Sequence, residues 1–578
     1  MKSYFVGMPT LGKPLKERAV QRSEASVLAI REIERRIAVE VERVKAAGLP
    51  AEDLNQRGQM TGWQRIEYLV DPGTWCPLHT LYDPLLNAEG TTGVIDGLAK
   101  VGGKWAVVIA SNPQVLAGAW IKGQSENILR VTDMTRRLHV PLIWILNCSG
   151  VKLTEQEEVF PNRRGHGAPF FRHAQLNQLG VPILVGIYGT NPAGGGYHAI
   201  SPTVLFAHKD CNFAVGGAGI VGGMSPKGTG FDDEAAEVVI KAQRAFRAKP
   251  PGAVDIHYDA TGFIRQVYDT EEGVLDGIRE YMKTLPAYDP AFFRVAPPAE
   301  PAFAPGELER IVPIDQTETY KIEEVIARLV DGSEALEFRA GYGPEVYCGL
   351  CKLDGFLVGL IANRQGFLGQ GYPEYADYPG PGGKLFRQGL IKMNEFVTLC
   401  SRDRIPLVWL QDTSGIDVGN LAEKAELLAL GQALIYSIQD ANTPMACVVV
   451  RKAHGAAHYV LGGPPAYDHN VFTLGTPTAE VQVMHGETAA VACFGRRLVK
   501  EKDAGHSLQP VLDNMNALAA EYREKSTPRY GAIRGYLDEV VRFQDLRRYL
   551  VAFAGAVYQN PTSICPHYQM LTPRVTRG

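Results

Sequence analysis

The stretch VPLIWILNCSGVKL, residues 140–153, recurs without a gap as IPLVWLQDTSGIDV at residues 405–418. The two copies share Pro, Leu, Trp, Ser and Gly, and most other positions exchange like for like. Two more pairs of segments match in the same order along the chain, residues 97–110 with 349–362 and residues 181–197 with 443–459. Three matches in one order indicate that the chain is an internal duplication.

A proline-rich segment separates the two copies. Residues 286–313 contain seven prolines, which disfavour long helices and central strands and therefore mark a linker. Ahead of the first copy, apolar residues at helical spacing predict an amphipathic helix within residues 14–48: Val27, Ile30, Ile33, Ile37, Val41 and Val44. We expect a helical extension, an N-terminal domain and a C-terminal domain, over residues 1–60, 61–299 and 300–578.

Each copy alternates strands and helices, which predicts an α/β fold with mainly parallel strands. Within each copy, two strands run into turns of small residues. The first strand ends at Ser149-Gly150 or Ser414-Gly415, and the second ends at residues 193–196 (AGGG) or 455–457 (GAA). After the first turn, Thr154 and Glu157 have the spacing of a capping box that opens a helix, and Asn420 with Glu423 gives a similar but weaker signal.

Turns of Gly and Ala at strand ends leave backbone N–H groups available to another molecule. Two such turns on adjacent strands would direct two N–H groups at one oxygen, the arrangement that stabilises an enolate, and losing one donor costs about 3 kcal/mol of barrier. The alternative is that these are merely tight loops. Their recurrence in register favours a functional role, although common ancestry alone would also preserve a structural turn.

The bulk composition excludes some partners and compartments. The 578 residues carry a net charge of −4 without a basic run, so nothing points to nucleic acid or a membrane surface. Nine cysteines without a disulfide-like rhythm favour a reducing compartment, and the cytoplasm is the expectation. The N-terminal sequence lacks a signal-peptide pattern, and no apolar run approaches the ~18 residues of a membrane span.

Other motifs are weaker. The pair Cys348 and Cys351 has CxxC spacing but no second pair, which favours a buried structural role. His454 and His458 have the spacing to share a helix face, but no third metal ligand accompanies them, so we expect no metal site. The sequence has no P-loop spacing and no strand-to-helix GxGxxG with a following acidic residue, so nothing suggests bound ATP or NAD.

The two halves, with SG and AGG turns in the first and DTSG and GAA turns in the second, resemble the carboxyltransferase components of biotin-dependent enzymes. The resemblance runs nearly end to end, and the segments that carry it are PNRRGHGAPFFR (161–172), GTNPAGGGYHAISP (189–202), AVGGAGIVGGMSPKG (214–228), PPGAVDIHY (250–258), LVWLQDTSGIDVGN (407–420), AAHYVLGGP (456–464) and NPTSICPHYQM (560–570). It implies two tandem crotonase-like domains, related by the duplication.

The resemblance also implies sites. The N-terminal half would bind an acyl-CoA and the C-terminal half biotin, with the two sites meeting across a homodimer or in a larger oligomer. The thioester oxygen would be held by backbone donors of Val151 and Gly194 or Gly195. The biotin ureido oxygen would be held by Ile416 and Gly455 or Ala456, with Gly415 and Ala457 lining that site.

Basic residues follow the first turn. Arg163 and Arg164 are equally compatible with binding CoA phosphates and with a solvated loop. The family pattern usually has SGGA, TPGF and YGGA where this chain has SGVK, TSGI and HGAA, which leaves backbone donors in place but bears on pocket size and substrate choice.

Within the family, the resemblance is strongest to sodium-pumping decarboxylases, with glutaconyl-CoA as substrate and crotonyl-CoA as product. The partners implied are a biotin carrier subunit and a membrane sodium-pump subunit, which would hold the chain at the inner membrane face. Lys392 sits within the helical pattern LFRQGLIKMNEFVTL, so we expect biotin on another subunit. The alternatives are an acyl-CoA carboxylase subunit, a crotonase-type hydratase or isomerase, and a scaffold with one inactive half.

Overall fold

The computed structural model describes residues 7–161, 163–200, 203–217, 232–248, 250–287, 289–369, 380–463 and 469–559. Residues 218–228 of the AVGGAGIVGGMSPKG segment and the whole of NPTSICPHYQM lie outside this range. The chain divides into two compact units. The N-terminal unit comprises Val41–Asp289 and Gln559–Gly578, and the C-terminal unit comprises Met1–Glu40 and Pro290–Tyr558.

The N-terminal unit is built on a seven-stranded sheet with strand order β1-β2-β3-β4-β5-β7-β9. The pairs β1–β2 and β2–β3 are antiparallel, and every pair from β3 to β9 is parallel. The strands are β1 (Cys76–Leu78), β2 (Val94–Val101), β3 (Lys104–Ser111), β4 (Leu142–Leu146), β5 (Ile183–Ile187), β7 (Val204–His208) and β9 (Gln266–Tyr268), with a separate pair β6 (Thr190–Pro192) and β8 (Asn212–Ala214).

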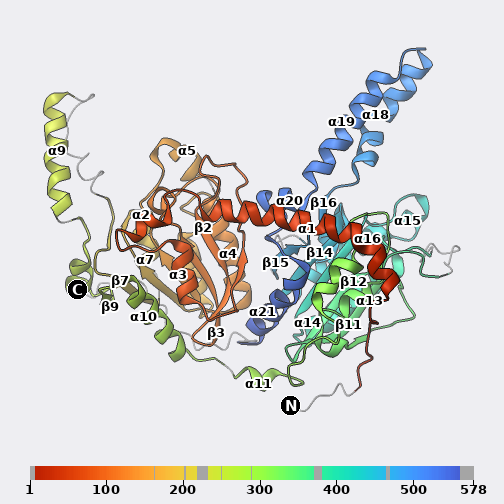
Figure 1. The fold of residues 1–578 in the computed structure, drawn as a ribbon, viewed down its shortest axis with the longest axis horizontal. Helices are drawn as coiled ribbons and strands as arrows, with labels where there is room; N and C mark the ends of the chain where they lie inside the picture. Colours follow the sequence, from red (N-terminus) through yellow and green to blue (C-terminus); the bar gives the residue numbers. More distant parts are fainter. Residues whose placement is uncertain are drawn as a thin grey trace. The chain divides into compact units, whose positions relative to one another are not determined.

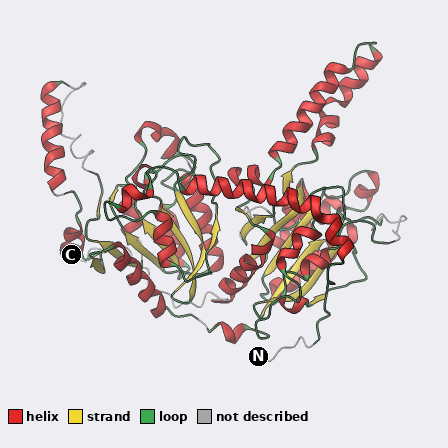
Figure 2. Ribbon diagram, viewed as in Figure 1, coloured by secondary structure: helices red, strands yellow, loops and turns green. Residues whose placement is uncertain are grey.

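Most helices of this unit lie around the sheet, whereas α9 (Asp233–Ala248) extends away from it (Figures 1 and 2). The other helices are α2 (Ala51–Asn55), α3 (Gly62–Leu69), α4 (Gln124–Leu138), α5 (Gln156–Val159), α6 (Phe170–Gln178), α7 (Gly194–Ile200) and α10 (Glu271–Thr284). Helices α3 and α10 join the core that contains Ile143 of β4 and Leu184 of β5. Continuous apolar runs such as LIWIL form strands that are buried along their whole length, as expected for parallel strands covered by helices.

The C-terminal unit repeats this plan. Its sheet has the order β10-β11-β12-β13-β14-β15-β17, with β16 added beside β14. The strands are β10 (Ala335–Glu337), β11 (Val346–Leu353), β12 (Phe356–Asn363), β13 (Leu407–Thr413), β14 (Met445–His454), β15 (Asn470–Gly475), β16 (Glu480–Gln482) and β17 (Glu539–Val540). An antiparallel hairpin again leads into parallel strands, which confirms the predicted duplication and the α/β class.

The helices of the C-terminal unit are α11 (Pro290–Phe293), α12 (Leu308–Ile311), α13 (Ile322–Ile326), α14 (Arg387–Arg402), α15 (Asn420–Lys424), α16 (Leu427–Gln439), α17 (Ala456–Val460), α18 (Gly486–Asp503), α19 (Gln509–Lys525), α20 (Pro528–Arg534) and α21 (Leu546–Gln559). Helices α14 and α16 cover the core around Trp409. Helices α18 and α19 pack side by side and form an arm (Figure 1).

The predicted N-terminal amphipathic helix is present as α1 (Glu17–Lys45). Val27 and Ile30 are buried, and the residues up to Glu40 belong to the C-terminal unit. Arg310 of that unit binds α1, because its Nη1 lies 2.8 Å from a carboxylate oxygen of Glu24. The helix therefore belongs with the C-terminal half for most of its length.

The prediction of a capping box at Thr154 and Glu157 is wrong. Residues Leu153–Glu155 form a short 3-10 turn that leads into α5, and no side chain caps either helix. Thr154 lies inside the turn rather than ahead of a helix, because Lys152 at its start is held by Glu89 and Glu155. A helix does begin at Asn420, but its N-cap is Gly419 and no side chain caps it.

Candidate active site

The first strand-end turn of the N-terminal unit is held by the main chain of Trp120. The N–H of Trp120 donates to the carbonyl of Gly150 at 2.7 Å, and the carbonyl of Trp120 accepts from the N–H of Lys152 at 2.9 Å. In such a parallel bridge the intervening residue, Val151, directs its N–H away from the bridge. Among the described residues the N–H of Val151 donates no hydrogen bond, so it is available to a ligand.

The C-terminal unit repeats this clamp with Leu385 and Ile416, which lie 265 positions after Trp120 and Val151. The N–H of Leu385 donates to the carbonyl of Gly415 at 3.0 Å, and its carbonyl accepts from the N–H of Asp417 at 3.0 Å. Like the N–H of Val151, the N–H of Ile416 donates no hydrogen bond to a described residue. Both predicted donors of the first turns therefore have N–H groups that no described residue uses.

The second turn is also repeated in backbone detail. Ala193 and Gly455 occupy equivalent positions and have φ angles of 49° and 57°. The N–H of Ala193 donates to the carbonyl of Ala214 at 2.7 Å, and that of Gly455 donates to the carbonyl of Gln482 at 3.0 Å. The proposal of Gly455 as a donor is thereby corrected, since its N–H is already used by the small sheet beside the turn.

The next residues open helices. Gly194 is the first residue of α7 and Ala456 is the first residue of α17, followed by Gly195 and Ala457. The first N–H groups of a helix have no partner within the helix. Gly194 and Ala456 are therefore equivalent candidates for the donor of the second turn in each half. They are positioned by the same backbone turn in each half.

Buried polar side chains tie the two turns of each half together, by different means. In the N-terminal unit, the Asn191 side chain accepts from the N–H of Cys148 at 2.7 Å and donates to the carbonyl of Tyr188 at 2.7 Å. In the C-terminal unit, Asp412 of β13 accepts from Arg451 of β14 at 2.8 Å, and both side chains are fully buried. These ties fix the ends of adjacent strands against each other.

Three histidines lie beneath the first pair of turns. His198 of α7 contacts His173 of α6 through ring nitrogens 3.2 Å apart, and it stacks on Trp144 with ring centroids 4.3 Å apart. Burial lowers the pKa of His166 and of His173 to about 4, and burial lowers that of His198 well below its ordinary value. All three imidazoles are therefore neutral near pH 7 and support the turns by packing, without adding charge.

The two arginines differ. The guanidinium of Arg164 pairs with the carboxylate of Glu126 in the first turn of α4, which raises the Arg164 pKa. Arg163 is exposed and makes no ion pair within the described part of the chain. Arg163 is consequently the one of the two that is available to a phosphate.

The histidines of the C-terminal turn do not share a helix face, because His454 ends β14 and His458 lies in α17. One ring nitrogen each of His454 and His485 and a carboxylate oxygen of Glu480 do lie within 4.8 Å of one another. Nε2 of His454, however, has the amide of Gln482 at 3.2 Å. The cationic side chain of Lys452, 9% exposed, lies on the same side of the strand, and we interpret the cluster as a polar network.

Two more interpretations from sequence are decided by burial. Cys348 and Cys351 lie in β11, both are fully buried and neither is in a disulfide. Their burial is as the sequence predicted, and it raises the pKa of both thiols. Lys392 in α14 is also fully buried, and its ammonium donates to Glu337 and to the carbonyl of Val346, each at 3.0 Å. A lysine held in this way is unsuited to carry biotin.

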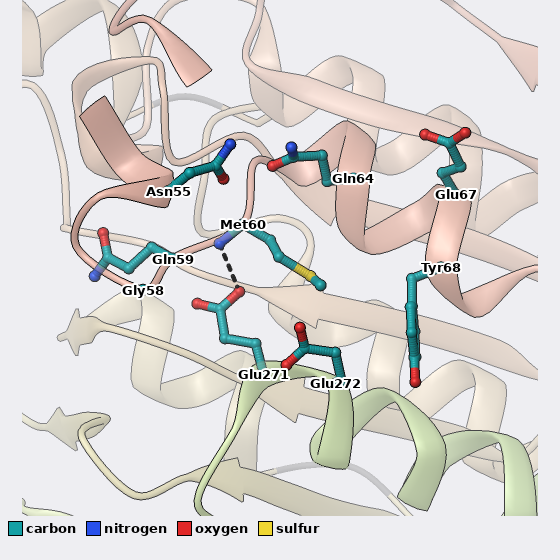
Figure 3. A pocket seen from close by; sticks show the side chains of 9 residues that line it. All are labelled: Asn55, Gly58, Gln59, Met60, Gln64, Glu67, Tyr68, Glu271 and Glu272. Atoms are coloured by element: carbon teal, nitrogen blue, oxygen red, sulfur yellow. Dashed lines mark hydrogen bonds between the residues drawn. The ribbon is translucent and has the colours of Figure 1, made fainter. Parts of the chain in front are cut away.

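A pocket of about 490 Å³ opens at the start of α10 (Figure 3). It is lined by Asn55, Gly58, Gln59, Met60, Gln64, Glu67, Tyr68, Glu271 and Glu272. Glu271 is already engaged, since its carboxylate accepts from the N–H of Met60 and pairs with Arg65. No residue of the donor turns lines this pocket, so it is not part of the candidate active site.

Comparison with known families decides the assignment. The model of the carboxyl transferase domain family matches residues 53–571. The chain belongs to this family. The glutaconyl-CoA decarboxylase alpha subunit of Acidaminococcus fermentans is 54% identical over 579 residues, covering 100% of this chain and 98% of that protein. The biotin-dependent 3-methylcrotonyl-CoA carboxylase beta1 subunit of Mycobacterium tuberculosis is 28% identical over 499 residues, covering 85% and 87%.

Among solved structures, the geranyl-CoA carboxylase beta subunit of P. aeruginosa superimposes with a TM-score of 0.78 at 22% identity. The match covers 98% of this chain and 100% of that one. It establishes the fold as two tandem crotonase-like domains, as the sequence predicted, and the family makes this chain a carboxyltransferase. Within the described residues, no helix combines the length and apolar character needed to span a membrane.

The residues that hold the donor turns were missed in the sequence. No local sequence pattern indicates that these side chains hold the turns. They are Trp120, Asn191 and the pair Asp412 and Arg451. The offset of 265 positions between the halves aligns Trp120 with Leu385. Sequence alone does not show that the two residues have the same role, because the bridges to Val151 and Ile416 are visible only in the structure.

Proposed function

We propose that this chain transfers the terminal carboxyl group of glutaconyl-CoA to biotin on a separate carrier subunit and releases crotonyl-CoA. The observation that carries the proposal is the repeated main-chain clamp, which frees Val151 and Ile416 as donors beside the helix starts at Gly194 and Ala456. The 54% identity to a glutaconyl-CoA decarboxylase alpha subunit supports the choice of substrate.

In the N-terminal half, the N–H groups of Val151 and Gly194 would donate to the thioester oxygen. Breaking the bond between the carboxyl carbon and C4 leaves its electron pair on the acyl chain as a dienolate, whose charge rests on that oxygen. Preorganised N–H groups stabilise such charge without reorganising, which is worth about 3 kcal/mol for each donor. The dienolate is then protonated to crotonyl-CoA. The ureido nitrogen of biotin loses one proton when it takes up CO2, so the overall reaction neither consumes nor releases a proton.

In the C-terminal half, Ile416 and Ala456 would donate to the ureido oxygen of biotin, with Gly415 and Ala457 beside it. When bound, biotin supplies the nitrogen that accepts CO2. The site fits the group, because a neutral ureido carbonyl needs N–H donors and the two turns of this half offer two that no described residue uses. Buried Lys392 leaves no lysine of that helix to carry biotin, which supports a separate carrier.

Exposed apolar side chains lie next to the turns of both halves. They are Leu153 and Tyr197 in the N-terminal unit and Val418, Leu421 and Tyr459 in the C-terminal unit. Exposed apolar groups beside a functional site are typical of surfaces that another subunit covers. We therefore propose a homodimer or larger homo-oligomer whose partners are a biotin carrier and a membrane sodium-pump subunit, which would place the chain in the cytoplasm at the inner membrane face.

The test is incubation of the purified chain with glutaconyl-CoA and free biotin, with crotonyl-CoA followed by chromatography. Biotin-dependent formation of crotonyl-CoA is the expected result. Malonyl-CoA and methylmalonyl-CoA are run alongside, and turnover of these esters alone would assign the chain to the carboxylase branch. Turnover without biotin would indicate a hydratase or isomerase, and no turnover with any ester would favour a scaffold.

A further inference from the structure

We infer that Trp120 is a positioning residue of the first oxyanion site, because its main chain holds one donor turn of the N-terminal half and its side chain packs against the other. This inference rests on the proposed function of those turns. Its main chain clamps Gly150 and Lys152 on either side of Val151. Its side chain reaches the other turn at Gly194, so one residue spans the two donors.

The contact with Gly194 is close. A Cβ built on Gly194 would lie 1.9 Å from Cη2 and 2.3 Å from Cζ3 of the indole, so the ring occupies the space that a side chain would need. Glycine at position 194 and tryptophan at position 120 are therefore required together. The far edge of the indole sets how closely the helix α7 can approach the turn at Val151.

The indole is itself held rigidly. It is 4% exposed and stacks on His166 with ring centroids 4.6 Å apart, and His166 in turn contacts the carbonyl of Val159 and the side chain of Gln124. His198 of α7 meets the same indole edge-on at 5.7 Å. A side chain packed on several sides has one rotamer and little space in which to relax. The indole therefore fixes the position of Gly194 relative to the turn at Val151.

The duplication supplies an internal comparison. Leu385 makes the same main-chain clamp in the C-terminal unit, and the residue equivalent to Gly194 there is Ala456, which carries a Cβ. A leucine therefore occupies the position at which the N-terminal half has the aromatic ring. The acyl-CoA half has acquired an aromatic spacer between its donors, which fits a site that must stabilise a full enolate charge.

The experiment is a double-mutant cycle on the full chain with W120L, G194A and W120L/G194A. Leucine is the residue of the equivalent position in the C-terminal half, so W120L keeps the main-chain clamp and removes the spacer. We expect W120L to lower kcat at least 10-fold with little change in KM, and G194A to lower it about 100-fold because the methyl group displaces the ring. The double variant should recover at least 10-fold over G194A, because the methyl group then fills the vacated space.

A second readout does not depend on turnover. The carbonyl stretching frequency of bound crotonyl-CoA, measured by difference infrared spectroscopy, reports the strength of the donors at the thioester oxygen. We expect the frequency to be lowered in the wild type and to return towards the solution value in the order W120F, then W120L. W105L is the matched control, since Trp105 is 9% exposed and lies at the start of β3, away from the donor turns.

The outcomes separate the two claims. Unchanged kcat and carbonyl frequency in folded W120L, or strictly additive effects of the two substitutions, would overturn the role of Trp120 while leaving the proposed function standing. A wild-type chain that turns over no glutaconyl-CoA yet shows the expected frequency series would remove the proposed substrate and keep the positioning role. Equal frequency shifts in W105L and W120L would reduce Trp120 to a general packing residue.

Discussion

At the scale of single residues, the proposed mechanism uses main-chain N–H groups, and their availability depends on the hydrogen bonds that the surrounding residues make. Gly455 and Ala456 illustrate this. Both are small residues in one turn, but the N–H of Gly455 donates to Gln482, whereas Ala456 opens a helix. Their side chains do not distinguish them. The difference lies in the hydrogen bonds that their N–H groups make in the folded chain.

Removing the donor of Ala456 is possible with little damage to the fold. Ala456 is the first residue of α17, where proline is tolerated because its N–H has no helical partner. We expect A456P to lower carboxyl transfer by about 10²- to 10³-fold through loss of one donor. A456G, which keeps the N–H, is the control and should retain most activity in the crotonyl-CoA assay. Equal activity of A456P and wild type would remove this donor from the mechanism.

The buried histidines predict a pH dependence of stability. His173 has a folded pKa of about 4, below the ordinary value of about 6.5, so the unfolded chain binds the proton more readily. The stability that the neutral ring provides is complete above about pH 6.5 and is lost as the pH falls towards 4, with a loss of about 2 kcal/mol at pH 5.

Urea unfolding at pH 7 and pH 5 measures this effect. H173Q should reduce the difference between the two free energies of unfolding, because a titrating group is gone. H506Q is the matched control, since His506 is exposed and pairs only with the nearby Glu501. An identical difference in wild type and H173Q would show that His173 does not contribute to the acid sensitivity.

At the scale of elements, a buried ion pair joins two helices that cover the N-terminal sheet. Arg65 of α3 and Glu271 of α10 lie 2.7 Å apart, with side chains 1% and 5% exposed. The N–H of Met60 donates to the same carboxylate (Figure 3). Such a pair is costly to break on one side, since the remaining charge is then buried without a partner.

We therefore expect E271A to lower the free energy of unfolding by about 3–5 kcal/mol, measured by chemical denaturation. The double variant R65M/E271L, which removes both charges, should be closer to wild type than E271A. E280A, at an exposed position of the same helix, is the control and should have little effect. A double variant less stable than E271A would mean that the pair contributes by attraction rather than by mutual neutralisation.

At the scale of the whole molecule, the duplication gives one chain two donor sites of one design with different surroundings. If the acyl-CoA site of one subunit meets the biotin site of another, as the family resemblance implies, variants defective in different halves should complement each other. We expect coexpressed G194A and A456P chains to regain about a quarter of the wild-type activity, because random pairing makes half of the dimers mixed and each mixed dimer has one intact site.

Either variant expressed alone is the reference for that experiment, and sedimentation of the wild type gives the oligomeric state. Activity of the mixture no higher than the mean of the two single variants would place each complete site within one chain. A monomeric and fully active wild type would contradict the proposed oligomer.

The sequence by itself determined the duplication, the α/β class and the positions of the donor turns. Periodic apolar runs and small-residue turns are local patterns that can be read from the sequence. The repeat of VPLIWIL as IPLVWLQ supports the same strand assignment in both halves. The N-terminal helix was predicted for the same reason, since a 3.6-residue apolar period can be read without knowing what it packs against.

The tertiary structure alone decided which N–H groups are free and what holds them. Trp120 precedes Gly194 by 74 positions, and the indole meets that glycine only because β4 and β5 are adjacent in the sheet. Asp412 and Arg451 likewise meet across two parallel strands. Hydrogen bonds and contacts between distant residues depend on strand order and register. Neither leaves a local pattern in the chain.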